Sequence, residues 1–295
     1  VVDFCAANWL VFTPPLTSSI SGLRLLGDPP SAILRKKTKQ SASRGLRLPT
    51  TQLLPGSNSV GMRRMSDRSA PAQAIVIGAN GGIGAAVLAA LKNHDEYAQA
   101  LGFARPDLDL EDEGSIAAAA ARVATAPFAT RLVIDATGFL HGGGQAPEKG
   151  LRDLSSAKLA RSFAINAIGP ALLMKHFLPL FPRDGKAVFA TLSARVGSIG
   201  DNQLGGWYGY RTSKAALNQL VRTAAIELRR SRPKATCVAL HPGTVVTPLS
   251  GPFTKSGLDV REPEAAANDL LNVIDRLTPE MSGGFFDQNG QVIPW

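Results

Sequence analysis

A tyrosine and a lysine four residues apart, Tyr210 and Lys214, are the residues whose types and spacing point most directly to chemistry. Side chains at positions i and i+4 share one face of a helix, so a helix here would hold the phenol beside the ammonium group. A phenol has a pKa of about 10 in water, and a nearby positive charge favours the phenolate and lowers that pKa. We therefore predict that Tyr210 exchanges a proton with a substrate oxygen.

A glycine run far upstream predicts a second kind of chemistry. It directly follows a short apolar segment, residues 74–77, and opens a helical stretch. In that setting glycines allow a tight turn and a close backbone approach to phosphate, which also meets the free N–H groups and the positive end of the helix dipole. A glycine cluster alone would be equally typical of a flexible turn, but its context favours a dinucleotide pyrophosphate site. The residues of this predicted site are Gly78, Asn80, Gly82, Ile83 and Gly84.

The rest of the sequence alternates short apolar runs with helical stretches. The apolar runs are residues 74–77, 100–104, 131–134, 187–190 and 235–240. The helical stretches are residues 83–93, 115–126, 158–181, 210–230 and 263–277. Buried runs of this kind are typical of parallel strands, and right-handed crossovers through the helices build a doubly wound sheet. We predict an α/β fold with a mainly parallel sheet, as a single Rossmann-like domain over residues 71–295.

The residue after the second apolar run is expected to recognise the ribose of a bound dinucleotide. An acid here would bind the 2′-hydroxyl of NAD, but the sequence has Arg105, which can pair with the 2′-phosphate of NADP. NADP(H) is therefore favoured, and NAD(H) is the alternative because surface arginines that face water are common. Asp109 and Leu110 would line the adenine, although Asp109 would equally cap a helix that begins near Glu111.

These motifs together resemble the short-chain dehydrogenase/reductase family, and the resemblance covers residues 74–295. The segments that occur in the family's order and approximate spacing are the glycine run, Asn166, Tyr210 with Lys214, and His241 to Thr247. Three further segments look like the C-factor-type or sniffer-type carbonyl reductase branch. They are Ser193 to Ile199, Gly205 to Arg211 and the ending Phe286 to Trp295.

The resemblance implies roles for further residues. Lys214 would also hold the nicotinamide ribose, and Asn166 would position a water in a proton relay. An asparagine in an apolar helical stretch also needs a buried partner, whatever its role. The family's Asn-Asn-Ala-Gly segment begins with Asp135 here, so the hydrogen bonds that support this strand are expected to differ. The cofactor contacts that the resemblance adds are Ala136, Thr137, Gly138, Pro242, Gly243, Val245 and Thr247.

The family also places a serine after its fifth strand to hydrogen-bond the substrate oxygen. Ser193 and Ser198 both qualify, and a strict count back from Tyr210 would choose Ala194. We favour Ser193, because it ends the strand where a hydroxyl can reach the site. Ser198 in a turn is the structural alternative.

The charge distribution separates the first 70 residues from the rest. Residues 1–70 carry 10 Lys and Arg against three acids, whereas residues 71–295 carry 22 against 20. The basic, Ser- and Pro-rich stretch is predicted to be a disordered extension, either a presequence or translated upstream sequence. We expect a cytoplasmic protein, or one in a mitochondrion or plastid if residues 1–61 are a true presequence.

Composition also narrows the range of partners. The nearly neutral body has no basic block with interleaved aromatics, so no nucleic acid is expected. No apolar run is long enough to suggest a membrane span, and no histidine or cysteine has metal-ligand spacing, so we expect neither a membrane nor a metal. The helices that carry Asn166 and Tyr210 would pack against the sheet or against other subunits, so a homodimer or homotetramer stays open.

We therefore expect an NAD(P)H-dependent oxidoreductase that interconverts a small-molecule carbonyl and an alcohol. The alternative is a dinucleotide-binding signalling or scaffold protein of the C-factor type with little turnover. Substrate specificity is expected to depend on three loops, whose sequences do not indicate which substrate they bind. They are residues 141–148, 202–207 and 247–260.

Overall fold

The computed structural model describes residues 71–253 and 260–295 of the chain. The predicted extension over residues 1–70 lies outside the described residues, as does part of the third predicted specificity loop, residues 254–259. Six parallel strands form one sheet in the order β2-β1-β3-β4-β5-β8. The strands are β1 (Ala72–Ile77), β2 (Tyr97–Phe103), β3 (Ala129–Asp135), β4 (Ala187–Leu192), β5 (Ala235–His241) and β8 (Phe285–Asp287). The predicted doubly wound α/β fold is confirmed.

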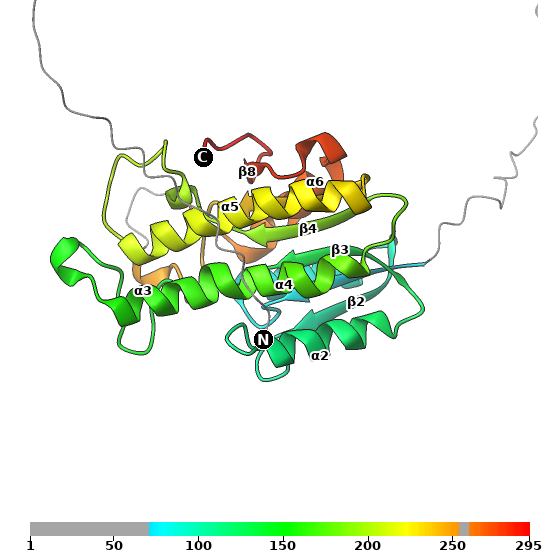
Figure 1. Cartoon of the computed structure of the whole chain (residues 1–295), viewed down its shortest axis with the longest axis horizontal. Coiled ribbons are helices and arrows are strands. Elements are labelled where there is room, and N and C mark those ends of the chain that lie inside the picture. The colour runs from blue at the N-terminus through cyan, green and yellow to red at the C-terminus, as the bar shows by residue number, and fades with distance from the viewer. Residues whose placement is uncertain (1–70, 254–259) are drawn as a thin grey trace, which may run out of the picture. The chain divides into compact units, whose positions relative to one another are not determined.

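Helices cover both faces of this sheet. Figure 1 shows α2 (Glu113–Ala124), α4 (Gly169–Phe177) and α5 (Tyr208–Ser231) side by side over one face. On the opposite face α1 (Gly82–Lys92) packs against α6 (Pro263–Arg276). Five short single turns connect these elements. They are the 3₁₀ helices η1 (Leu151–Asp153), η3 (Leu178–Leu180), η4 (Arg195–Gly197), η5 (Gly251–Phe253) and η6 (Pro279–Met281).

The sheet has an apolar layer on each face because side chains alternate along each strand. In β1, Ile75 and Ile77 belong to the layer beneath α2, α4 and α5, whereas Ala74 and Val76 belong to the layer beneath α1 and α6. All four are fully buried. A strand buried on both faces has no polar alternation, which explains why the strands are continuous apolar runs in the sequence.

Three short strands were not predicted from the sequence. β8 extends the main sheet beyond β5, with Ala239 opposite Phe285 and His241 opposite Asp287. β6 (Thr244–Val245) and β7 (Val260–Arg261) form a separate parallel pair. Strands of two or three residues are too short to have a readable hydrophobic period.

The stretch predicted as one helix over residues 158–181 is divided in the structure. α3 (Ser156–Phe163) leads into a π-helical turn, η2 (Ala164–Ile168), and α4 follows. The π turn contains Asn166. Such turns insert one extra residue into the helical ladder and are frequent at functional sites.

The same stretch is apolar along most of its length. Ser156–Leu180 is 25 residues long and has a mean hydropathy of 1.3 in its most apolar window, so by length and composition alone it could cross a membrane. The prediction that no apolar run is long enough to suggest a membrane span was wrong for this stretch. Leu173, Met174 and Phe177 of this stretch are buried against the sheet, and this packing accounts for the apolar side chains.

Of the two roles predicted for Asp109, the helix cap was wrong, because α2 begins two residues after Glu111 and two residues before the predicted stretch 115–126. The helix begins at Glu113, and its N-cap is Asp112, whose side chain accepts a hydrogen bond from the backbone N–H of Gly114. Asp109 instead accepts from the backbone N–H of Glu111 at 3.0 Å and closes a local turn before the helix. Asp109 and Asp112 are both residues that can cap a helix, and Asp112 is the one adjacent to the first helical residue.

The backbone is closely packed at the glycine turn, as the glycine spacing predicted. Gly78 has a φ of +81°, in the left-handed region that favours glycine. A β-carbon on Gly84 would overlap the carbonyl oxygen of Gly78, because the first turn of α1 lies directly against the end of β1.

We expect Gly84→Ala to lower the free energy of unfolding by about 3 kcal/mol, because the overlap involves backbone atoms that cannot rotate away. Urea denaturation followed by circular dichroism measures this change. Gly150→Ala is the matched control, because a β-carbon there meets no atom within 4 Å and the residue has an extended backbone. The control should change stability by less than about 0.5 kcal/mol. Equal stability of the two variants would show that the α1 start is not tightly packed.

Candidate active site

The glycine turn lies at the end of β1, where the order of successive strands across the sheet reverses. β1 has β2 on one side and β3 on the other, and in such sheets ligands bind at the carboxyl ends of the strands beside this point. The N–H groups of Gly78 and Ala79 both donate to the carbonyl of Phe103, at 2.8 and 3.1 Å. A β-carbon on Gly78 would lie 3.0 Å from the carbonyl oxygen of Ala136. The turn therefore ties together the ends of β1, β2 and β3.

A cavity of about 690 Å³ opens beside this turn, and we call it the glycine-turn cavity. Its walls include eight residues that the sequence analysis assigned to a cofactor. They are Gly78, Asn80, Arg105, Asp109, Leu110, Ala136, Thr137 and Gly138. The first N–H groups of α1 have no partner within the helix, so the turn suits a phosphate. The residues present therefore fit a dinucleotide.

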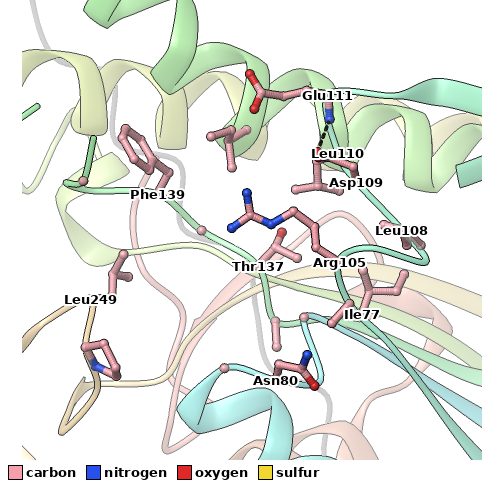
Figure 2. A pocket seen from close by; sticks show the side chains of 18 of the residues that line it. Ile77, Asn80, Arg105, Leu108, Asp109, Leu110, Glu111, Thr137, Phe139 and Leu249 are labelled. Atoms are coloured by element: carbon pink, nitrogen blue, oxygen red, sulfur yellow. Dashed lines mark hydrogen bonds between the residues drawn. The ribbon is translucent and has the colours of Figure 1, made fainter. Parts of the chain in front are cut away.

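The charged side chain of Arg105 extends into this cavity in Figure 2, toward Thr137 and Phe139, and Asp109, Glu111 and Arg161 also line it. The residue is exposed and follows β2 directly after Ala104. Asp109 also lines the wall, but its carboxylate is engaged in the turn to Glu111 that Figure 2 marks with a dashed line. Arg105 is therefore placed to meet an anionic ligand, whereas Asp109 is partly committed to its own loop.

A second cavity, of about 570 Å³, lies around Tyr210, and we call it the tyrosine cavity. It brings together seven predicted residues from four segments of the chain. They are Ile83, Ser193, Tyr210, Pro242, Gly243, Val245 and Thr247. Leu249 lines both cavities, so the two meet at this residue. Trp207 and Phe253 form an aromatic wall, with ring centroids 5.3 Å apart.

Three predicted cofactor residues, Gly82, Gly84 and Lys214, line neither cavity. Gly82 and Gly84 serve close packing instead, because a β-carbon on Gly82 would lie 2.9 Å from the Thr247 methyl group and one on Gly84 would meet Gly78. Their side-chain-free surfaces let α1 approach the loops that carry the cavity walls.

Tyr210 and Lys214 share a face of α5, as the four-residue spacing predicted. The Lys214 Nζ atom lies 5.9 Å from the centroid of the Tyr210 ring. Lys214 is only 2% exposed, and its ammonium group donates to the carbonyl of Leu192 at 2.7 Å. Burial lowers the pKa of Lys214 to about 8, and the buried carboxylate of Asp135 opposes this shift.

The predicted effect of the lysine on the tyrosine was wrong for this structure. Burial raises the pKa of Tyr210 to about 12. Desolvation of the charged phenolate therefore outweighs the attraction of the ammonium group, which is directed at Leu192. The half-buried phenol consequently holds its proton at neutral pH.

Asn166 is fully buried and has the partners that its position requires. Its Nδ2 atom donates to the carbonyl of Phe139 at 2.7 Å and to Ser213 Oγ at 3.1 Å, and its Oδ1 atom accepts from the N–H of Phe139 at 2.7 Å. A β-carbon on Gly138 would lie 3.8 Å from Lys214 Nζ and 3.9 Å from Asn166 Oδ1. Both polar groups therefore lie directly behind a residue of the cavity wall.

Asp135 provides the altered strand support that the sequence analysis expected. The carboxylate is fully buried at the end of β3 and accepts from the N–H and hydroxyl of Thr137 at 3.1 and 2.5 Å. Its second oxygen accepts from the Thr191 hydroxyl at 2.7 Å. Burial raises the pKa of Asp135, while these hydrogen bonds and Lys214 act in the opposite direction. The carboxylate joins β3 to β4 beneath the site.

The two candidate serines occupy different environments. Ser193 lines the tyrosine cavity, and its hydroxyl lies 2.7 Å from Asn218 Oδ1. Ser198 is buried and accepts from the N–H of Asp201 at 3.1 Å in the following turn. It is not among the residues that line that cavity. Of the two hydroxyls, the structure brings that of Ser193 to the same cavity as Tyr210.

Several cavity residues were not named individually from the sequence. Trp207, Leu249 and Phe253 come from the irregular segments predicted to set specificity, or border them. Phe139 lies just beyond the predicted Ala136 to Gly138 contacts. Asn218 lies one helical turn beyond Lys214, and its spacing is the signal that would have identified it.

A glycine turn at the switch point of a parallel sheet is typical of a dinucleotide-binding fold. Here Tyr210 lines the adjoining cavity, and the buried Lys214 lies one helical turn further along α5. A family profile described as enoyl-(acyl carrier protein) reductase matches residues 79–272. The chain belongs to the short-chain dehydrogenase/reductase family, as the motifs predicted.

Three known proteins illustrate this relationship. The C-signal protein of Myxococcus xanthus is 41% identical over 147 residues, which cover 49% of this chain and 83% of that protein. An NADPH-bound carbonyl reductase from chicken fatty liver is 26% identical with a TM-score of 0.67, over 77% of this chain and all of that one. The carbonyl reductase Sniffer of D. melanogaster has the same fold, with 24% identity, the same coverage and a TM-score of 0.66.

We expect the affinity for NADPH to fall roughly 10-fold as the pH rises from about 7 to about 9.5, because Lys214 loses its ammonium charge near pH 8. The phenol of Tyr210 stays protonated over this range and does not contribute. Fluorescence titration at a series of pH values measures the affinity. Lys214→Met should bind weakly and without this inflection; the same inflection in that variant would assign it to another group.

Proposed function

We propose that this chain is an NADPH-dependent reductase that converts a small-molecule carbonyl compound to an alcohol, or catalyses the reverse oxidation. The observation that carries the proposal is the half-buried phenol of Tyr210 in a cavity that adjoins the glycine turn, with the Lys214 ammonium group on the same helical face. The likeness to an NADPH-bound carbonyl reductase supports the same assignment.

A bound nicotinamide dinucleotide would supply the hydride for the carbonyl carbon. The N–H groups at the start of α1 would hold its pyrophosphate, and Arg105 would pair with its 2′-phosphate. Lys214 would hold the nicotinamide ribose from behind Gly138. NADP(H) is favoured over NAD(H) because a cation, rather than an acid, extends into the cavity after β2.

Tyr210 donates its proton to the carbonyl oxygen as negative charge develops there. A phenol with a pKa of about 12 is protonated at the start of this step, which matches the needs of reduction. Ser193, which lines the same cavity, hydrogen-bonds the same oxygen. Asn166 fixes the Phe139 backbone behind the cavity wall. There it would position the water of a proton relay.

A second candidate is a dinucleotide-binding signalling or scaffold protein with little turnover. The 41% identity to a C-signal protein favours it. A protein of that kind would bind the cofactor without needing a polar group to hold Tyr210 or Lys214 in place. The buried hydrogen bond from Lys214 to Leu192 therefore favours an enzyme over a scaffold protein.

We expect Tyr210→Phe to reduce turnover at least 100-fold while cofactor affinity changes less than about threefold, because only the proton donor is removed. Absorbance loss at the reduced-nicotinamide band, with a panel of aldehydes and ketones, measures turnover. Tyr208→Phe is the matched control two residues earlier on the same helix and should retain activity. Cofactor binding without turnover in the unmodified protein would favour the signalling function.

We expect Arg105→Ala to raise the KM for NADPH roughly 10- to 100-fold and to leave the KM for NADH nearly unchanged, because only NADPH has the 2′-phosphate. Steady-state kinetics with both cofactors measures the change. Arg152→Ala removes an exposed arginine that forms no part of either cavity and serves as the control. An equal loss with both cofactors would rule out recognition of the 2′-phosphate by Arg105.

A further inference from the structure

A third polar residue continues the face of α5 that carries Tyr210 and Lys214. Asn218 follows Lys214 by four residues, so it lies one helical turn further along this face. It is only 2% exposed and lies at the end of β4 rather than in solvent. A buried amide has to be hydrogen-bonded to offset its lost hydration, so its partner indicates its purpose.

That partner is Ser193. The Ser193 hydroxyl lies 2.7 Å from Asn218 Oδ1, and the serine side chain is itself nearly fully buried. The Ser193 backbone is fixed separately, because its N–H donates to the carbonyl of Leu240 at 2.8 Å. The remaining freedom of Ser193 is the direction of its hydroxyl, and Asn218 controls that direction.

The orientation of the Asn218 amide decides where the serine proton points. With Oδ1 toward Ser193, the hydroxyl donates its single proton to the amide and has none for a substrate oxygen. In this orientation Asn218 Nδ2 is buried without a hydrogen-bond partner among the described residues. Orphaned buried N–H groups are rarer than orphaned oxygens, so the exchanged orientation, with Nδ2 toward Ser193 Oγ, is favoured on this ground.

We propose that Asn218 is a positioning residue whose amide donates to Ser193 Oγ and thereby directs the serine proton into the tyrosine cavity. The proposal rests on the proposed function, because it assigns that proton to the carbonyl oxygen of the substrate. Asn218 acts only through Ser193 and contacts neither the substrate nor the cofactor. Its removal therefore slows the chemical step and leaves ligand binding largely intact.

The experiment compares Asn218→Leu, Ser193→Ala and the double variant by steady-state kinetics. Leucine has a similar branched shape, although it is larger, and it cannot hold the hydroxyl. We expect Ser193→Ala to lower kcat about 100-fold, as the loss of one donor to a developing oxyanion does. Asn218→Leu should lower kcat about 10-fold with less than a threefold change in KM. In the Ser193→Ala background it should have no further effect, because the hydroxyl it positions is gone.

Two controls separate positioning from damage to the fold. Gln219→Leu makes the same kind of change at the next, exposed position of α5 and should leave kcat unchanged. Asn218→Ala replaces the leucine variant if the latter does not fold, as judged by thermal melting and NADPH binding. The same kcat loss is expected, because alanine also lacks a donor.

Three results would overturn the proposal. The first is an unchanged kcat in Asn218→Leu, and the second is a raised kcat, which would mean that Asn218 withholds the serine proton. The third is a double variant whose losses multiply, which would mean that Asn218 acts on the fold and not through Ser193. Turnover that Tyr210→Phe abolishes establishes the reductase independently, so these results would reject the role of Asn218 alone.

Discussion

The hydrogen bond from the buried ammonium group of Lys214 to the carbonyl of Leu192 constrains the whole site. A charged lysine that is 2% exposed is costly to bury, and this bond fixes where α5 lies relative to the end of β4. The phenol of Tyr210 lies one turn earlier on the same helix. Its place in the cavity therefore follows from the anchoring of Lys214.

The strand ends beneath the site form a polar layer that compensates for this charge. Asp135 at the end of β3 contributes a buried carboxylate that favours the ammonium form of Lys214 and also binds the Thr191 hydroxyl of β4. Asn166 bonds both the N–H and the carbonyl of Phe139 just beyond β3. These hydrogen bonds fix the backbone of the cavity wall. Gly138 in this wall has no side chain, so its backbone lies close to the Lys214 ammonium group.

The sequence predicted the parts of this structure that repeat or follow spacing rules. Five strands, the helices between them and the shared face of Tyr210 and Lys214 were readable because apolar periodicity and the helical repeat are local properties. The pKa of Tyr210 was not, because its direction depends on burial by residues distant in sequence. The roles of Gly82 and of Asn218 likewise depend on contacts across the fold, to Thr247 and to Ser193.

In the function that we propose, hydride passes from a cofactor in the glycine-turn cavity to a carbonyl carbon in the tyrosine cavity. The most direct measurement is mass spectrometry of the alcohol formed with NADPH in which deuterium replaces both hydrogens at the reactive nicotinamide carbon. Direct transfer predicts one deuterium on the carbinol carbon of the product. An unlabelled alcohol, or cofactor binding with no alcohol from any carbonyl compound tested, would contradict this account.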